Sequence, residues 1–218
     1  LLHTEPGFRT QNILVANLVY ESRDFNNFSE QRYLQERARI QALNEKILAC
    51  PFIEYHQSCY ESIIEKTYGT NYINAKGESA YLNIMYVSPQ FFKMFDIDIE
   101  EGSIPEKPER STYVLNRAAM KALNFSSLGE AAVVEDNRKR RDANAPMSTI
   151  SAVVKDYYNG HLTAGAVPTI YEVSGFGGPR YQIAYPEGRK QDLLNYLKET
   201  MKGIYGAEEF TYTFLEDD

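Results

Sequence analysis

The 218-residue sequence contains no tryptophan, only two cysteines and only three histidines. His3, His56 and His161 are scattered, so the histidine and cysteine spacings of a zinc site are missing. No stretch has the ~20 consecutive apolar residues of a membrane-spanning helix, and no signal peptide is present. The His-Glu-x-x-His, Gly-x-Ser-x-Gly and Walker motifs are also missing. We therefore predict no catalytic residues, no metal site and no cofactor.

Positive charge is also scarce, because 23 basic residues face 30 acidic ones and the net charge is −7. This balance argues against nucleic acid as a partner and against adsorption to anionic lipid, since both depend on clustered positive charge. The one dense basic run is Arg138–Arg141, within the polar stretch 135–148. We interpret this stretch as a solvated loop, with contact to a lipid headgroup as the weaker alternative.

Tyrosine is abundant, with 17 residues in the chain. A tyrosine ring packs like an apolar group and keeps a polar tip, which suits half-buried sheets and interfaces. The two cysteines, Cys50 and Cys59, are interpreted as reduced and partly buried. A disulfide between them is the alternative for a domain outside the cytoplasm, where oxidation is favoured.

Both ends of the chain read as β-α-β units. In each unit a long helix with an apolar stripe lies between two strands. The predicted segments are strand 13–20, helix 29–49 and strand 53–60 near one end, and strand 180–185, helix 188–205 and strand 209–215 near the other. Ser29 is the expected N-cap of the first helix, and Gly206 is expected to end the second. Two such units can pair into one split sheet, which predicts that the first strand shares a sheet with the last ones.

The middle of the chain, residues 62–163, reads as a mainly β subdomain with two small helices. One helix lies within the stretch Tyr86–Phe95, with Ser88 as its N-cap and Pro89 at its first position. Its phenylalanines 91, 92 and 95 are predicted to plug a core. The other helix is Arg117–Leu123, with Asn116 as its N-cap. The strand 169–173 and the glycine cluster after it, residues 175–179, are interpreted as part of a hairpin.

Three motifs in the middle of the chain resemble a known family. They are Val-Ser-Pro-Gln-Phe-Phe-Lys-Met-Phe at 87–95 followed by Glu-Gly at 101–102, Val-Leu-Asn at 114–116, and Ser-Ala-Val-Val-Lys-Asp-Tyr-Tyr at 151–158. Their order and spacing are similar to those in the extracytoplasmic core domain of MacB/FtsX-type ABC transporter permeases. One departure is Ser103, where the family often has arginine.

The resemblance implies an α+β fold in two parts. Residues 1–61 and 164–218 would form a split β-α-β, porter-like subdomain from both chain ends, and residues 62–163 would form the inserted, mainly β subdomain. The domain would lie on the periplasmic face of the inner membrane, as a soluble part of an integral membrane protein. We expect transmembrane segments beside both ends of this chain.

The function implied is non-catalytic coupling of ATP-driven helix motion to a periplasmic adaptor or cargo, in efflux, lipoprotein handling or hydrolase regulation. The partners would be an ATP-binding subunit or domain and the transmembrane segments, in a homo- or heterodimeric permease.

Two other hypotheses remain open. One is a free-standing periplasmic or secreted module that binds a protein or glycan through a compact, tyrosine-lined groove. The other is an enzyme of unrecognised type, which no motif supports. Candidate partner contacts are Phe176 in the glycine cluster and Tyr157 and Tyr158 at a strand end, although the last two also read as a structural junction.

Overall fold

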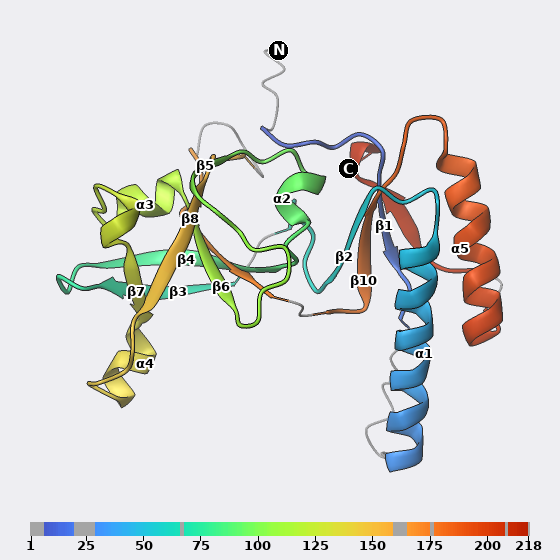
Figure 1. Cartoon of the computed structure of the whole chain (residues 1–218), viewed down its shortest axis with the longest axis horizontal. Coiled ribbons are helices and arrows are strands. Elements are labelled where there is room, and N and C mark those ends of the chain that lie inside the picture. Colours follow the sequence, from blue (N-terminus) through green and yellow to red (C-terminus); the bar gives the residue numbers. More distant parts are fainter. Residues whose placement is uncertain are drawn as a thin grey trace. The chain divides into compact units, whose positions relative to one another are not determined.

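The computed structural model describes residues 7–19, 29–65, 68–158, 165–174, 177–207 and 209–217. The chain divides into two compact units (Figure 1). We call Thr10–Tyr60 with Gly177–Asp218 the terminal unit, and Leu1–Arg9 with Glu61–Phe176 the inserted unit. Helices and strands occur in both, so the α+β class predicted from the sequence is confirmed.

The terminal unit contains a four-stranded antiparallel sheet. Its strands are β1 (Ile13–Asn17), β2 (Tyr55–Cys59), β10 (Arg180–Ala184) and β11 (Tyr212–Phe214), in the order β11-β1-β10-β2. β1 pairs with β10 on one side and with β11 on the other. The prediction that the first strand shares a sheet with the last ones is therefore confirmed.

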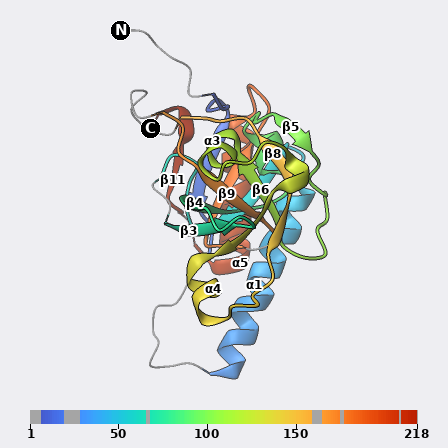
Figure 2. The same cartoon turned by 90° about the vertical axis from the view of Figure 1, so that its left-hand side faces the viewer.

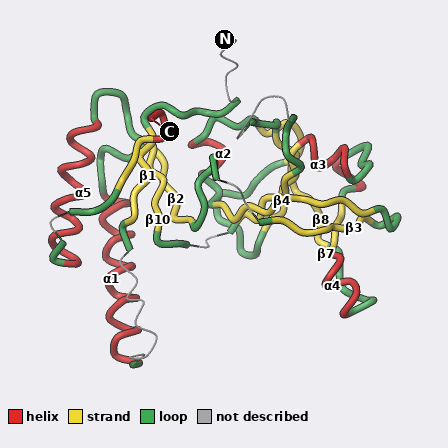
Figure 3. Tube along the Cα trace, turned by 180° about the vertical axis from the view of Figure 1, so that it is seen from behind, coloured by secondary structure: helices red, strands yellow, loops and turns green. Residues whose placement is uncertain are grey.

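Two long helices pack on this sheet, α1 (Glu30–Ala49) and α5 (Lys190–Tyr205), and they lie side by side (Figure 1 and Figure 3). The predicted cap is present, because the backbone N–H of Arg32 donates to the Ser29 hydroxyl at 3.2 Å. Gly206 ends α5 at a φ of 68°, which glycine adopts without strain. The helices and strands share one apolar core, which includes Leu14, Ala16, Leu18, Leu43, Ile47, Tyr181, Ile183, Leu193, Leu197 and Met201.

The two cysteines lie in this unit, and both are buried thiols that form no disulfide. Cys50 ends α1 and Cys59 ends β2. The interpretation as reduced thiols is confirmed. Burial raises the pKa of the Cys50 thiol, which makes it a weak nucleophile.

The inserted unit is built on seven strands. They are β3 (Gly69–Asn74), β4 (Ser79–Val87), β5 (Ile99–Gly102), β6 (Thr112–Asn116), β7 (Ala132–Glu135), β8 (Ser148–Val154) and β9 (Thr169–Val173), in the order β5-β8-β6-β9-β4-β3-β7. β7 pairs with β3 and also with β8. Six strands therefore close into a small barrel, and β5 extends it by pairing with β8.

Side chains from alternate strand positions fill the barrel, as expected for so few strands. This core includes Tyr72, Leu82, Ile84, Leu115, Ala119, Met120, Leu123, Val133, Ile150, Val153 and Ile170. Helix α3 (Arg117–Ala122) and the short 3-10 turn η2 (Leu128–Glu130) close one end. The Asn116 side chain caps α3 by accepting a hydrogen bond from Ala119 N at 3.0 Å, as predicted.

Helix α4 (Asp136–Arg141) lies toward the opposite end of the barrel from α3 (Figure 1 and Figure 2). The interpretation of residues 135–148 as a loop is therefore wrong for the basic run, which is helical and exposed. The helix is favoured locally, because Asp136 in its first turn forms an ion pair with Arg140 at 2.6 Å, one turn later.

The predicted phenylalanine plug packs on the outer face of the barrel. Phe91 and Phe95 are 0% exposed and Phe92 is 3% exposed, which confirms their burial. The rings of Phe91 and Phe92 lie 5.9 and 5.2 Å from the Tyr171 ring on β9. The helix α2 (Phe91–Met94) is a single turn that begins later than predicted, with the Ser88 hydroxyl accepting from Gln90 N at 3.3 Å.

Strand β9 corrects one part of the sequence analysis. Residues 164–218 were assigned to the subdomain of the chain ends, yet β9 pairs with β4 and β6 in the barrel. The next strand, β10, pairs with β1 and β2, so β9 and β10 do not form the predicted hairpin. Four of the five residues of β9 are buried, which is the environment of a central strand.

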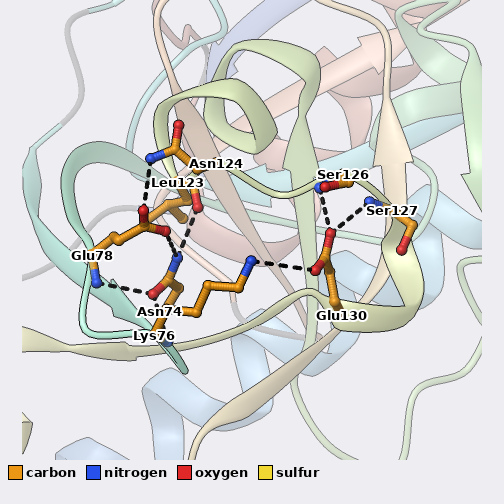
Figure 4. Close-up of polar contacts among 8 residues, drawn as sticks. All are labelled: Asn74, Lys76, Glu78, Leu123, Asn124, Ser126, Ser127 and Glu130. Carbon is orange, nitrogen blue, oxygen red and sulfur yellow. Dashed lines mark hydrogen bonds and ion pairs between the residues drawn. The ribbon is translucent and has the colours of Figure 1, made fainter.

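The β3–β4 turn is tied to the end of α3 by the side chain of Asn74 (Figure 4). Its amide oxygen accepts from Lys76 N at 2.9 Å and from Glu78 N at 3.0 Å, and its amide nitrogen donates to Leu123 O at 2.9 Å. The Lys76 ammonium extends toward Glu130 on η2, 3.8 Å away (Figure 4). These contacts fix the elements that close this end of the barrel.

Candidate binding surface

The structure describes two of the three predicted contact residues. Tyr157 is 7% exposed, its hydroxyl donates to Met85 Sδ at 3.1 Å, and its ring packs edge-on against Phe8 at 5.3 Å. Tyr158 is 37% exposed. Phe176 lies outside the described residues. Tyr157 is thus a core residue of the inserted unit, and Tyr158 presents its ring to solvent.

Tyr158 borders an open groove of about 560 Å³ beside α3. The Arg117 guanidinium in this groove pairs with the carboxylates of Glu100 and Glu101 on β5. The Asp156 carboxylate accepts a hydrogen bond from Ala118 N at 3.0 Å, although burial raises the pKa of this carboxyl. These charges hold β5, α3 and the end of β8 together. The groove is lined by Arg117, Ala118, Lys121, Ala122, Asp156, Tyr158, Ala166 and Pro168.

The end of the barrel opposite α3 carries a second, more concentrated group of polar aromatic side chains. Tyr86, Glu172 and Tyr113 are direct neighbours across the strands β4, β9 and β6. Tyr72 and Glu135 are direct neighbours across β3 and β7. We call these five residues the tyrosine–glutamate mouth. Directly paired residues point to the same side of a sheet, and here that side is the barrel interior.

The mouth has a buried floor and an exposed rim. Tyr72 lies at its floor with 6% exposure, and its hydroxyl lies 3.5 Å from Glu135 Oε1. Tyr86 lies at its rim with 40% exposure. The Ser111 hydroxyl donates to the Glu172 carboxylate at 2.7 Å. A small recess of about 30 Å³ opens here, lined by Tyr72, Tyr113, Val133, Val134, Glu135, Arg138 and Ser148.

The electrostatics of the mouth keep its phenols neutral. Burial raises the pKa of Tyr72, Tyr86 and Tyr113, and the nearby carboxylates raise it further, Glu135 most for Tyr72 and Glu172 most for the other two. Both effects disfavour a second negative charge at the site. The Arg138 guanidinium lines the same recess and acts in the opposite direction on the pKa of Tyr113. The mouth therefore offers neutral aromatic rings beside two carboxylates and one guanidinium.

This arrangement is suited to binding. Within the described ranges, no group of three or more histidine, cysteine, aspartate or glutamate side chains is placed to hold a metal ion. The sequence analysis missed the mouth, because its residues come from five strands that are far apart in the chain. The abundance of tyrosine was the available signal, but composition does not show which positions of different strands lie opposite one another.

The fold has similar relatives among solved structures. No family model matches the chain, and no curated protein matches it in sequence. Its fold is similar to those of the periplasmic region of MacB and of the extracellular domain of an ABC-type transporter, the kind of domain that the sequence motifs resemble. Because the sequence identities are 14% or lower, this likeness establishes the fold.

Three solved structures carry the comparison. The periplasmic region of MacB from Actinobacillus actinomycetemcomitans matches with a TM-score of 0.55 and 14% identity, over 99% of this chain and 94% of that one. A permease domain from Porphyromonas gingivalis matches with a TM-score of 0.54 and 14% identity, over 79% and 75%. The extracellular domain of the ABC-type transporter YknZ from Gram-positive bacteria matches with a TM-score of 0.55 and 8% identity, over 92% and 97%. In the part of the chain that the structure describes, no helix combines the length and apolar character needed to cross a membrane.

Proposed function

We propose that this chain is the non-catalytic extracytoplasmic domain of an ABC transporter permease on the periplasmic side of the inner membrane. The observation that carries the proposal is the fold likeness to the periplasmic region of MacB, which spans 99% of this chain and 94% of that one. The three sequence motifs support it independently, since they were identified from residues alone.

The two units fit two roles in such a domain. The terminal unit has the strand order β11-β1-β10-β2, with α1 between β1 and β2 in sequence and α5 between β10 and β11. This order supports a porter-like subdomain of two interleaved β-α-β units. The inserted unit would be the second subdomain, with boundaries at 61 and 176 in place of 62 and 163.

The mechanism we propose is mechanical. ATP is hydrolysed by a separate cytoplasmic subunit or domain, and the transmembrane segments of a dimeric permease transmit the motion to this domain. The domain then acts on a periplasmic adaptor or cargo. Rigidity of the terminal unit suits this role, because its helices and strands share a single apolar core.

The test uses the full-length protein from its native cell. We expect it to remain in the membrane fraction after a high-pH carbonate wash and to co-purify with an ATP-binding subunit or carry an ATP-binding domain. We also expect no thermal shift of this domain with ATP and magnesium. A full-length protein released by the wash would refute the permease assignment and favour a free-standing binding module.

A further inference from the structure

We infer that the tyrosine–glutamate mouth is a docking site for an arginine side chain presented by a partner polypeptide. The inference rests on the barrel alone and goes beyond the permease role. Glutamate and tyrosine side chains from five strands converge on one end of the barrel, where a partner could reach them.

The central feature is the Tyr86–Glu172–Tyr113 row on three adjacent strands. A carboxylate between two aromatic rings attracts a cation in two ways, through an ion pair and through the negative faces of the rings. The described residues provide no ion-pair partner for Glu172, whose carboxylate accepts from the neutral Ser111 hydroxyl. Glu135, beside Tyr72, is a second carboxylate of the mouth and shares its recess with Arg138, so Glu172 is the carboxylate on which the inference rests.

The size of the site favours a side chain over a small molecule. Pockets for small ligands usually enclose ~300–1,000 Å³, whereas the recess beside the row, which Tyr113 and Glu135 line together with Arg138, measures about 30 Å³. Only the tip of a side chain fits such a depression, with its backbone remaining outside. The net charge of −7 adds a general attraction for basic segments.

Arginine fits this chemistry better than lysine. Its guanidinium is planar, so it can stack on a tyrosine ring while donating two parallel hydrogen bonds to one carboxylate. The lysine ammonium is a compact charge that water hydrates more strongly. It therefore loses more hydration free energy than a guanidinium when it enters a half-buried site.

The experiment is an NMR titration of the isotope-labelled 218-residue domain at low salt. The probe is the blocked peptide acetyl-Gly-Gly-Arg-Gly-Gly-amide, and its control carries citrulline, the neutral isostere of arginine. We expect the arginine peptide to shift the amide signals of residues 86, 113 and 172. We expect it to bind at least about tenfold more tightly than the citrulline peptide, a difference of ~1.4 kcal/mol.

Matched variants separate the site from general electrostatics. Glu172→Gln keeps an acceptor for Ser111 and should weaken arginine binding about fivefold or more, because the ion pair is lost. Glu199→Gln on α5 removes the same charge from the other unit and should leave binding unchanged. Tyr86→Ala should weaken binding, whereas Tyr81→Ala, an exposed tyrosine (58%) on the same strand, should not.

Several results would overturn the inference. Equal binding of the arginine and citrulline peptides would show that charge is not recognised. Equal weakening by Glu172→Gln and Glu199→Gln would show only non-specific attraction. Shifts in the mouth with chitotriose but not with the arginine peptide would identify a glycan site in its place.

Discussion

Phe95 is the residue of the aromatic plug at which truncation is expected to be most damaging. Its ring is fully buried, with centroids 4.9 Å from the Phe91 ring and 6.2 Å from the Phe8 ring. Phe95→Ala removes the whole ring and leaves a cavity, and such changes cost about 3–5 kcal/mol. The two ring contacts, each contributing ~0.5–1.5 kcal/mol beyond burial, place the expected loss in the upper half of that range.

The assay is urea unfolding followed by far-ultraviolet circular dichroism, with calorimetry to detect separate unfolding of the two units. For a chain of this size the expected loss lowers Tm by roughly 8–20 °C. Tyr81→Ala is the matched control, because its exposed ring should change stability by no more than about 0.5 kcal/mol. A loss below about 1 kcal/mol for Phe95→Ala would refute the plug as a core element.

Three further predictions concern stability. Asn116→Ala should lower the free energy of unfolding by about 2–4 kcal/mol in urea, because its side chain caps α3 and makes two further hydrogen bonds at the start of β9; a loss under about 0.5 kcal/mol would contradict this. Tyr171→Phe should lower the free energy of unfolding by about 0.5–1.5 kcal/mol, because the buried Tyr171 hydroxyl lies against the Tyr157 hydroxyl as a hydrogen-bond donor; unchanged or higher stability would argue against this hydrogen bond. The backbone N–H of Ser126 lowers the pKa of the Glu130 carboxyl from its usual 4.5. The ionised carboxylate therefore stabilises the fold above about pH 4.5, and this stabilisation is lost as the pH falls through the folded-state pKa. Glu130→Gln should therefore flatten the fall of Tm between about pH 5 and pH 3, and an unchanged slope would argue against this contact.

The sequence by itself determined the local structure, because the signals lie within a few residues of the elements they specify. Ser29 and Asn116 cap the helices that they were predicted to cap, and Gly206 ends α5. The apolar run that contains Phe95 could only be buried, since it leaves no polar face for water. The family motifs also came from residues alone, and the fold comparison agrees with them.

Only the tertiary structure decided how the strands combine. Strand β9 looks the same in sequence whether it pairs with β10 or lies between β4 and β6, because its apolar residues suit both places. Likewise, nothing near β7 in sequence indicates that it pairs with both β3 and β8 and so closes the barrel. Strand register depends on contacts between residues far apart in the chain. Tyr86, Tyr113 and Glu172 are therefore ordinary half-polar positions in the sequence, and they become one binding surface only when β4, β6 and β9 are aligned.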